Sequence, residues 1–227
     1  TFIIKLYLNI LFLQMCQISS WYINNHYYIL KMSNFFKDTD IDTSQAEAIV
    51  NETLKNCDDG ELYLENHKSE SIVLDDNKIK SSTYNSDQGY GFRAVTGEVV
   101  AYSHSNDISK ESLRKSSENL KDTLKSKKGT YNHEIPKTNS KYYENINPIE
   151  SKTFDSKIDL LNNVNNYLRS KGSIVNQVTA NFLGEHKSIE IIRSDNQVLK
   201  DDRPLVRFNV SVVLEKDGKK ETGVYGV

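Results

Sequence analysis

Histidine, cysteine and carboxylate side chains could bind zinc if the sequence spaced them for it. A zinc site needs such ligands in pairs at helical or knuckle spacing, whereas the histidines stand singly at positions 26, 67, 104, 133 and 186. His133 and Glu134 begin like a metalloprotease motif, but Pro136 prevents a helix there and no second histidine follows one turn later. We therefore expect no metal ligands, no catalytic residues and no cofactor in this chain.

A glycine-spaced segment at residues 89–94, Gly-Tyr-Gly-Phe-Arg-Ala, formally fits the dinucleotide-binding fingerprint. That fingerprint requires a turn from a strand into a helix, but here a short turn and a second strand are expected. Glycines inside a strand more often permit a bulge or a close approach of the backbone. Beside them, Tyr90, Arg93 and His104 combine aromatic, cationic and titratable character, which makes them the candidate residues for contact with a substrate. The alternative is that they are ordinary core or surface residues.

Composition narrows the classes of function further. The formal net charge is -2 with 26% charged residues, which gives no electrostatic indication of nucleic-acid binding. Cys16 and Cys57 lie far apart in segments of different character, which argues against a disulfide framework and favours a reducing, cytoplasmic location. None of the serines lies in a Gly-x-Ser-x-Gly elbow, so nucleophilic catalysis is not indicated.

The elements that would position these residues alternate between helical and strand periods. Apolar residues recur at helical spacing from 46 to 57 behind a capping box of Ser44 and Glu47. Two further amphipathic helices are expected, one from Ser109 towards Gly129 and one around residues 158–171, after a polar surface connection at 130–151. Short period-two segments with tight turns fill residues of about 60–104 and 174–227 and indicate antiparallel pairing. The predicted fold class is α+β, with a largely antiparallel sheet, about three amphipathic helices and two strand-rich blocks.

The two strand-rich blocks resemble each other. Residues 67–77 match residues 186–196 at one constant offset, since both segments begin His-Lys-Ser and end Asp-Asn. A duplicated hairpin would explain this match. Chance similarity would explain it equally well, because turn chemistry alone selects Asp and Asn.

Residues 1–31 differ in character from the rest of the chain. Their apolar run at 2–13 is too short to span a bilayer, and no small-residue cleavage site follows it. We expect a non-native or disordered extension here, with Met32 as the functional start and no membrane partner. A genuine anchor or export signal is the alternative.

Several stretches carry a family resemblance, weak one by one but specific in their order and spacing. They are DDGELYLE at 58–65, SESIVLDD at 69–76, QGYGFRAV at 88–95, AYSH at 101–104, and VRFNVSVV at 206–213 with ETG at 221–223. In these stretches the chain resembles the N-terminal region of the TldD/PmbA family, also called modulators of DNA gyrase, and is closer to the TldD branch.

The resemblance implies a cytoplasmic zinc metallopeptidase that processes small unfolded peptides together with a PmbA-type paralogue. Its zinc ligands belong to a C-terminal catalytic domain, which we expect to be absent here, so no catalytic residue is carried over. Residues 32–227 are then expected to be an N-terminal domain that admits an extended peptide, by pairing at a sheet edge, and binds the paralogue or the C-terminal domain. The alternative is a non-catalytic interaction protein related to gyrase or toxin-antitoxin modulation.

Overall fold

The computed structural model describes residues 34–125, 129–130 and 146–227. The expected extension at 1–31, Cys16 and the pair at 133 and 134 lie outside these residues. No helix within the described part of the chain is both long and apolar enough to cross a membrane.

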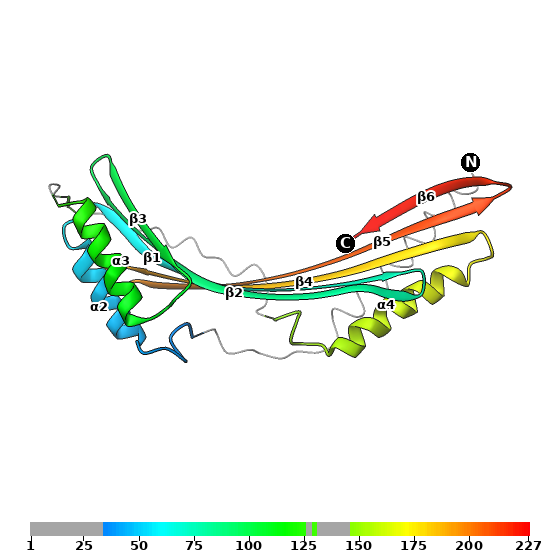
Figure 1. The fold of residues 1–227 in the computed structure, drawn as a ribbon, viewed down its shortest axis with the longest axis horizontal. Coiled ribbons are helices and arrows are strands. Elements are labelled where there is room, and N and C mark those ends of the chain that lie inside the picture. The colour runs from blue at the N-terminus through cyan, green and yellow to red at the C-terminus, as the bar shows by residue number, and fades with distance from the viewer. Residues whose placement is uncertain (1–33, 126–128, 131–145) are drawn as a thin grey trace.

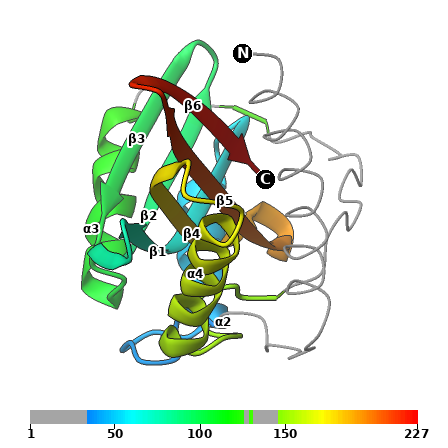
Figure 2. The ribbon, with the colours of Figure 1, turned by 90° about the vertical axis from the view of Figure 1, so that its right-hand side faces the viewer.

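Six strands form one curved antiparallel sheet (Figure 1). They are β1 (Asp59–Asp75), β2 (Lys78–Thr96), β3 (Val99–Ser105), β4 (Val175–Arg193), β5 (Val198–Lys216) and β6 (Lys219–Gly226). Their order across the sheet is β3-β2-β1-β4-β5-β6, and every neighbouring pair is antiparallel. The strands twist visibly along the length of the sheet (Figure 2), and the predicted α+β class is confirmed.

Within the described residues, three α-helices lie on one face of this sheet. The helices α2 (Thr43–Leu54) and α3 (Lys110–Thr123) cover one end, and α4 (Phe154–Arg169) covers the other (Figure 1). All three were expected, but α3 ends well before Gly129. The amide of Gly129 donates instead to the carbonyl of Asn56 at 2.8 Å, so the chain has already turned towards the end of α2.

The first helix begins earlier than the expected capping box. Asp42 is the N-cap residue; its carboxylate accepts a hydrogen bond from the Gln45 amide at 2.8 Å, and the Gln45 side chain completes the box. Ser44 therefore lies inside the first turn, where it cannot cap. Two overlapping segments fit the same motif, and the helix starts at the more N-terminal one.

Strand alternation produces two separate hydrophobic cores. Even-numbered residues of β1 point towards the helices along the whole strand, and those of β4 do so from Val178 onward. The first core packs Leu62, Leu64, Phe92, Ala94 and Ile192 against Val50, Leu54, Leu113 and Leu120 of α2 and α3. The second core packs Ile72, Leu74, Val178, Ala180, Phe208 and Val210 against Leu160, Leu161, Val164 and Leu168 of α4.

The strands are longer than the short segments expected from the sequence. Segments 62–65 and 71–74 form one strand, because the polar residues between them pair on both sides, with β2 and with β4. A strand with two paired neighbours satisfies its backbone groups even where its side chains are polar. The prediction of separate short strands was therefore wrong.

The repeat noticed in the sequence corresponds to a structural equivalence. The strands β1, β2 and β3 lie in mirror order to β4, β5 and β6, and a helix precedes the first strand of each half, β1 or β4. Residues 67–77 and 186–196 occupy equivalent places, each running from the middle of the sheet to a tight turn. Asn77 and Asn196 both adopt positive φ, at 68° and 58°, which explains why Asx residues occur at both turns.

Candidate functional site

The face of the sheet opposite the three helices, which we call the open face, is largely polar. Odd-numbered residues of β1 point to it, and in the register of the sheet they lie beside odd-numbered residues of β2 and β4. Its charged and aromatic members include Asp59, Glu61, Tyr63, Glu65, His67, Arg93, Lys187 and Arg193. Most are half-buried because each side chain packs against its cross-strand neighbours.

One part of the open face is a cluster of two arginines and two acids. Arg93 contacts Asp59 at 2.6 Å and Glu61 at 2.9 Å, while Arg193 contacts Asp59 at 2.5 Å. Burial alone would raise the pKa of Asp59, but the Arg93 hydrogen bond and the charges of both arginines outweigh it and lower that pKa. These ionised pairs therefore link β1 to β2 and to β4.

The acid-arginine cluster should make stability depend on pH. The pKa of Asp59 is lower in the folded chain than in the unfolded one, so its contribution is present above about pH 4 and is lost as pH falls further. We expect the urea midpoint of the full chain to fall between pH 5 and pH 3. Arg93→Met should flatten this fall, whereas Lys125→Met, which removes an exposed pair with Asp122, should leave it unchanged. Equal pH profiles for all three chains would show that the cluster is not the cause.

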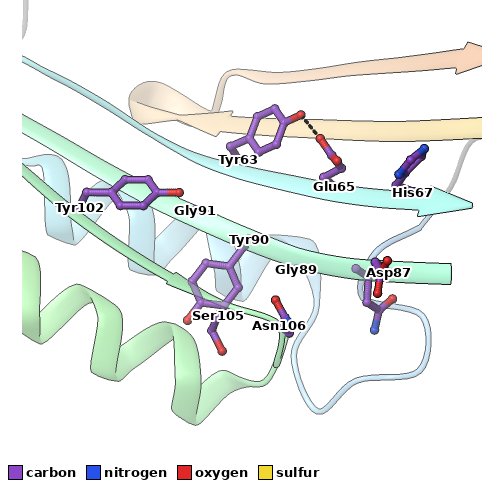
Figure 3. A pocket seen from close by; sticks show the side chains of 11 residues that line it. Tyr63, Glu65, His67, Asp87, Gly89, Tyr90, Gly91, Tyr102, Ser105 and Asn106 are labelled. Carbon is purple, nitrogen blue, oxygen red and sulfur yellow. Dashed lines mark hydrogen bonds between the residues drawn. The ribbon is translucent and has the colours of Figure 1, made fainter. Parts of the chain in front are cut away.

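A hollow of about 340 Å³ lies next to this cluster on the open face (Figure 3). Its lining comes from Tyr63, Glu65 and His67 of β1, residues 87–91 of β2, and Tyr102, Ser105 and Asn106. Gly91 makes room for the Tyr102 side chain, since a Cβ atom there would lie 2.5 Å from the Tyr102 hydroxyl. The glycines at 89 and 91 thus permit close approach, as their place within a strand predicted.

Hydrogen bonds hold the polar wall of the hollow in a defined state. The Tyr63 hydroxyl donates to Glu65 Oε2 at 2.5 Å, and Lys187 Nζ lies 3.2 Å from the other oxygen of that carboxylate. Burial and the contact with Glu65 raise the pKa of Tyr63. Burial would also raise the pKa of Glu65, but these two hydrogen bonds lower it. The hollow therefore presents a protonated phenol beside an ionised carboxylate.

The three residues expected to contact a substrate lie in different settings. Tyr90 is buried, and its hydroxyl is hydrogen-bonded to Ser112 and Ser116 of α3, both at 2.8 Å. Arg93 belongs to the acid-arginine cluster. His104 is exposed on β3 and stacks on Tyr102 with ring centroids 5.9 Å apart. A substrate contact by any of them stays a prediction.

Sequence reasoning missed most of the hollow. Tyr63, Glu65 and His67 follow each other at period two, a signal that they share one face of a strand. Their neighbours across the sheet are Gly91, Gly89 and Asp87. The register that brings these six residues together is not fixed by alternation alone.

The described residues lack a cluster of metal ligands. Within residues 34–125, 129–130 and 146–227, no group of three or more His, Cys, Asp or Glu side chains is placed to hold a metal ion. These residues do not supply a ligand set for a metallopeptidase metal, and we assign no step of hydrolysis to them.

Comparison with known proteins defines the class of this antiparallel α+β chain. The model for PmbA/TldA metallopeptidase domain 1 matches residues 60–125, and that for the PmbA/TldA metallopeptidase central domain matches residues 147–227. The chain therefore belongs to the PmbA/TldD metallopeptidase family, as its sequence motifs predicted.

Curated relatives place it in the TldD branch. The metalloprotease TldD homologue of Buchnera aphidicola subsp. Acyrthosiphon pisum is 35% identical over 173 residues, which cover 76% of this chain and 36% of the relative. The homologue of Haemophilus influenzae is 34% identical over 178 residues, with 76% and 36% covered. The chain thus spans about a third of the length of these relatives.

Solved structures share the fold. A protein of Bacteroides thetaiotaomicron described as a candidate modulator of DNA gyrase gives a TM-score of 0.61 at 13% identity, over 82% of this chain and 44% of that one. TldE of Thermococcus kodakarensis gives a TM-score of 0.58 at 13% identity, over 80% and 42%. At this identity the likeness concerns the fold alone.

Proposed function

We propose that this chain is the peptide-admitting and partner-binding region of a cytoplasmic, TldD-type zinc metallopeptidase, with the zinc held outside the described residues. The observation that carries the proposal is the hollow on the open face, in a chain that belongs to the PmbA/TldD family. The hollow has a few fixed polar groups beside aromatic walls, the usual make-up of a binding site for small ligands.

The size and polarity of the hollow favour a small unfolded peptide over a folded protein. A volume of about 340 Å³ accommodates one or two side chains. The Glu65 carboxylate can accept a hydrogen bond from a peptide amide. Tyr102, which is 63% exposed, offers an aromatic surface. Such a site would bind peptides of many sequences, because it contacts a terminus or the main chain more than a particular side chain.

The partner we propose is a paralogous subunit of the PmbA or TldE type. The likeness to TldE shows that a protein of that name has the same fold, and it supports a paralogous partner. The half-buried charged and aromatic side chains of the open face are groups that such a subunit could contact.

The hollow can be tested with one pair of variants on the same strand. Tyr102→Ala removes an exposed wall of the hollow, whereas Val100→Ala removes a side chain that is 59% exposed, two residues away and outside the hollow. We expect Tyr102→Ala to weaken the binding of an unstructured ten-residue peptide about tenfold, a loss of ~1.4 kcal/mol, and Val100→Ala to leave it unchanged. Isothermal titration calorimetry on the full chain, with thermal melts as the folding control, measures both. Equal affinities would show that the hollow does not bind peptide.

A second candidate function is non-catalytic modulation of gyrase or of a toxin-antitoxin system. The description of the Bacteroides neighbour as a candidate modulator of DNA gyrase favours it. Adding the full chain to a gyrase supercoiling reaction distinguishes the two candidates. A change in supercoiling rate by a chain that binds no peptide would favour modulation over peptide admission.

A further inference from the structure

The strand β2 continues beyond its neighbour β3. Residues 90–96 of β2 pair with β3, whereas residues 78–88 pair with β1 alone among the described strands. All eleven residues from 78 to 88 are exposed. We call this segment the β2 edge; at ~3.3 Å per residue it offers about 36 Å of backbone whose outward N–H and C=O groups can accept another strand.

The other half of the molecule has an equivalent edge that is guarded. Residues 198–207 of β5 lack an outer partner in the same way, since β6 pairs with residues 209–216 and Val227 exchanges backbone hydrogen bonds with Phe208. This segment contains Pro204 and a run of four charged residues at 200–203. Proline and charges are the usual means by which proteins prevent pairing at a sheet edge.

The β2 edge lacks these features in its centre. Residues 81–86 read Ser-Ser-Thr-Tyr-Asn-Ser, with no charge and no proline. The two halves are alike in strand order and pairing, so the difference between their edges is local to these segments. The β5 edge has features that prevent strand pairing and the β2 edge does not. This contrast indicates that another strand binds at the β2 edge.

Charges at the two ends of the β2 edge define the direction of the bound strand. Asp87 is exposed at the end next to the hollow, and no cation of the described residues forms an ion pair with it. Lys78 and Lys80 lie at the other end, Lys80 being 3.3 Å from Asp75 and 69% exposed. A strand antiparallel to β2 continues the direction of β3 and brings its amino terminus to Asp87 and its carboxylate to the lysines.

We propose that the β2 edge binds a short extended peptide of about eight to ten residues with free termini, as an added antiparallel strand in line with β3. The amino terminus of the peptide lies at the hollow beside Asp87, and its main chain pairs with residues 79–87. This proposal rests on the proposed function and adds to it the site, the direction and the length of the peptide. Because the contacts are to the main chain, binding tolerates many side chains.

The test uses the full chain and a ten-residue peptide of Thr, Val and Ser with free termini. In hydrogen-exchange measurements, we expect saturating peptide to slow exchange at least threefold at those amides of residues 79–87 that point away from β1. The guarded edge at 198–207 is the internal control and should not change. Protection at 198–207 alone, or at neither edge while the peptide is bound, would overturn the proposal.

Two modified peptides separate main-chain pairing from binding in the hollow. Methylation of two adjacent central amides disables both edges of the peptide and should weaken binding at least tenfold. Acetylation of the amino terminus should weaken binding about fivefold in the unchanged chain but have little effect in Asp87→Asn, since the carboxylate that recognises the ammonium group is then missing.

The possible failures are distinguishable. If the methylated peptide binds as well as the parent while Tyr102→Ala still weakens binding, the edge proposal fails and the hollow remains the peptide site. If no peptide binds, the proposed function fails together with it.

Discussion

Methionine in place of Lys157 is expected to lower the free energy of unfolding by about 3–5 kcal/mol. Lys157 lies on α4 and is 2% exposed; its ammonium group contacts the carboxylate of Glu70 and donates to the carbonyl of Ile149 at 2.7 Å. Glu70 lies on β1, also buried, at 8% exposure. Methionine fills a similar volume, so the cost comes from a carboxylate left buried without its cation and not from a cavity.

Two control variants identify the cause. Replacing both partners, Glu70→Leu with Lys157→Met, removes the uncompensated charge and should recover most of the lost stability. Lys121→Met removes an ion pair with Glu52 whose partners are 41% and 68% exposed, and should change stability by less than about 1 kcal/mol. Urea unfolding followed by circular dichroism measures all three. A double variant as unstable as the single one would show that the loss is in packing.

The position of this ion pair explains how α4 is aligned on the sheet. The pair lies on the helix side between the two hydrophobic cores, where β1 has Asn66, Lys68 and Glu70 in place of apolar residues. Lys68 in turn contacts Glu150, just before α4, at 2.7 Å. Two charged contacts therefore hold the start of α4 above the middle of the sheet, so that its apolar face meets the second core.

The helices and the fold class were predictable because they depend on short-range patterns. The apolar spacing of α4 identified Leu161, Val164 and Leu168, all of which are buried. The same pattern assigned Ile158 to the inner face, but Ile158 is half-buried and Lys157 is fully buried. A lysine at a core position becomes favourable only because Glu70, 87 positions earlier in the chain, lies opposite it, and no local pattern records that.

The candidate site was less predictable than the fold because it depends on register. The glycine-rich context suggested Tyr90 and Arg93 as substrate contacts, yet they point to opposite faces of β2: Tyr90 to α3, and Arg93 to the acids of β1. Alternation separates these faces but does not say which one is covered. Predicting the hollow would have required the register of three strands. Predicting the guarded and unguarded edges would have required the lengths of β3 and β6.

Alanine in place of Phe92 is expected to lower the free energy of unfolding by about 3–5 kcal/mol. Phe92 lies on β2 in the first core and is fully buried, so truncation loses its apolar contacts and leaves a cavity. The larger consequence concerns cooperativity. The strands β1 and β4 run unbroken from the first core to the second. If these strands unfold at one core, they therefore expose the apolar residues of the other core as well.

The amides of both cores should therefore lose protection together in Phe92→Ala. We expect global hydrogen exchange at Val210 and Val212, in the second core, to accelerate by the same factor as at Leu62 and Leu64, in the first. Leu161→Ala, a buried change in α4, should affect both cores in the same way. Val224→Ala, at a residue 68% exposed on β6, should change stability by less than about 0.5 kcal/mol. Unchanged protection at Val210 and Val212 in Phe92→Ala would mean that the two halves unfold independently and that the long central strands do not couple them.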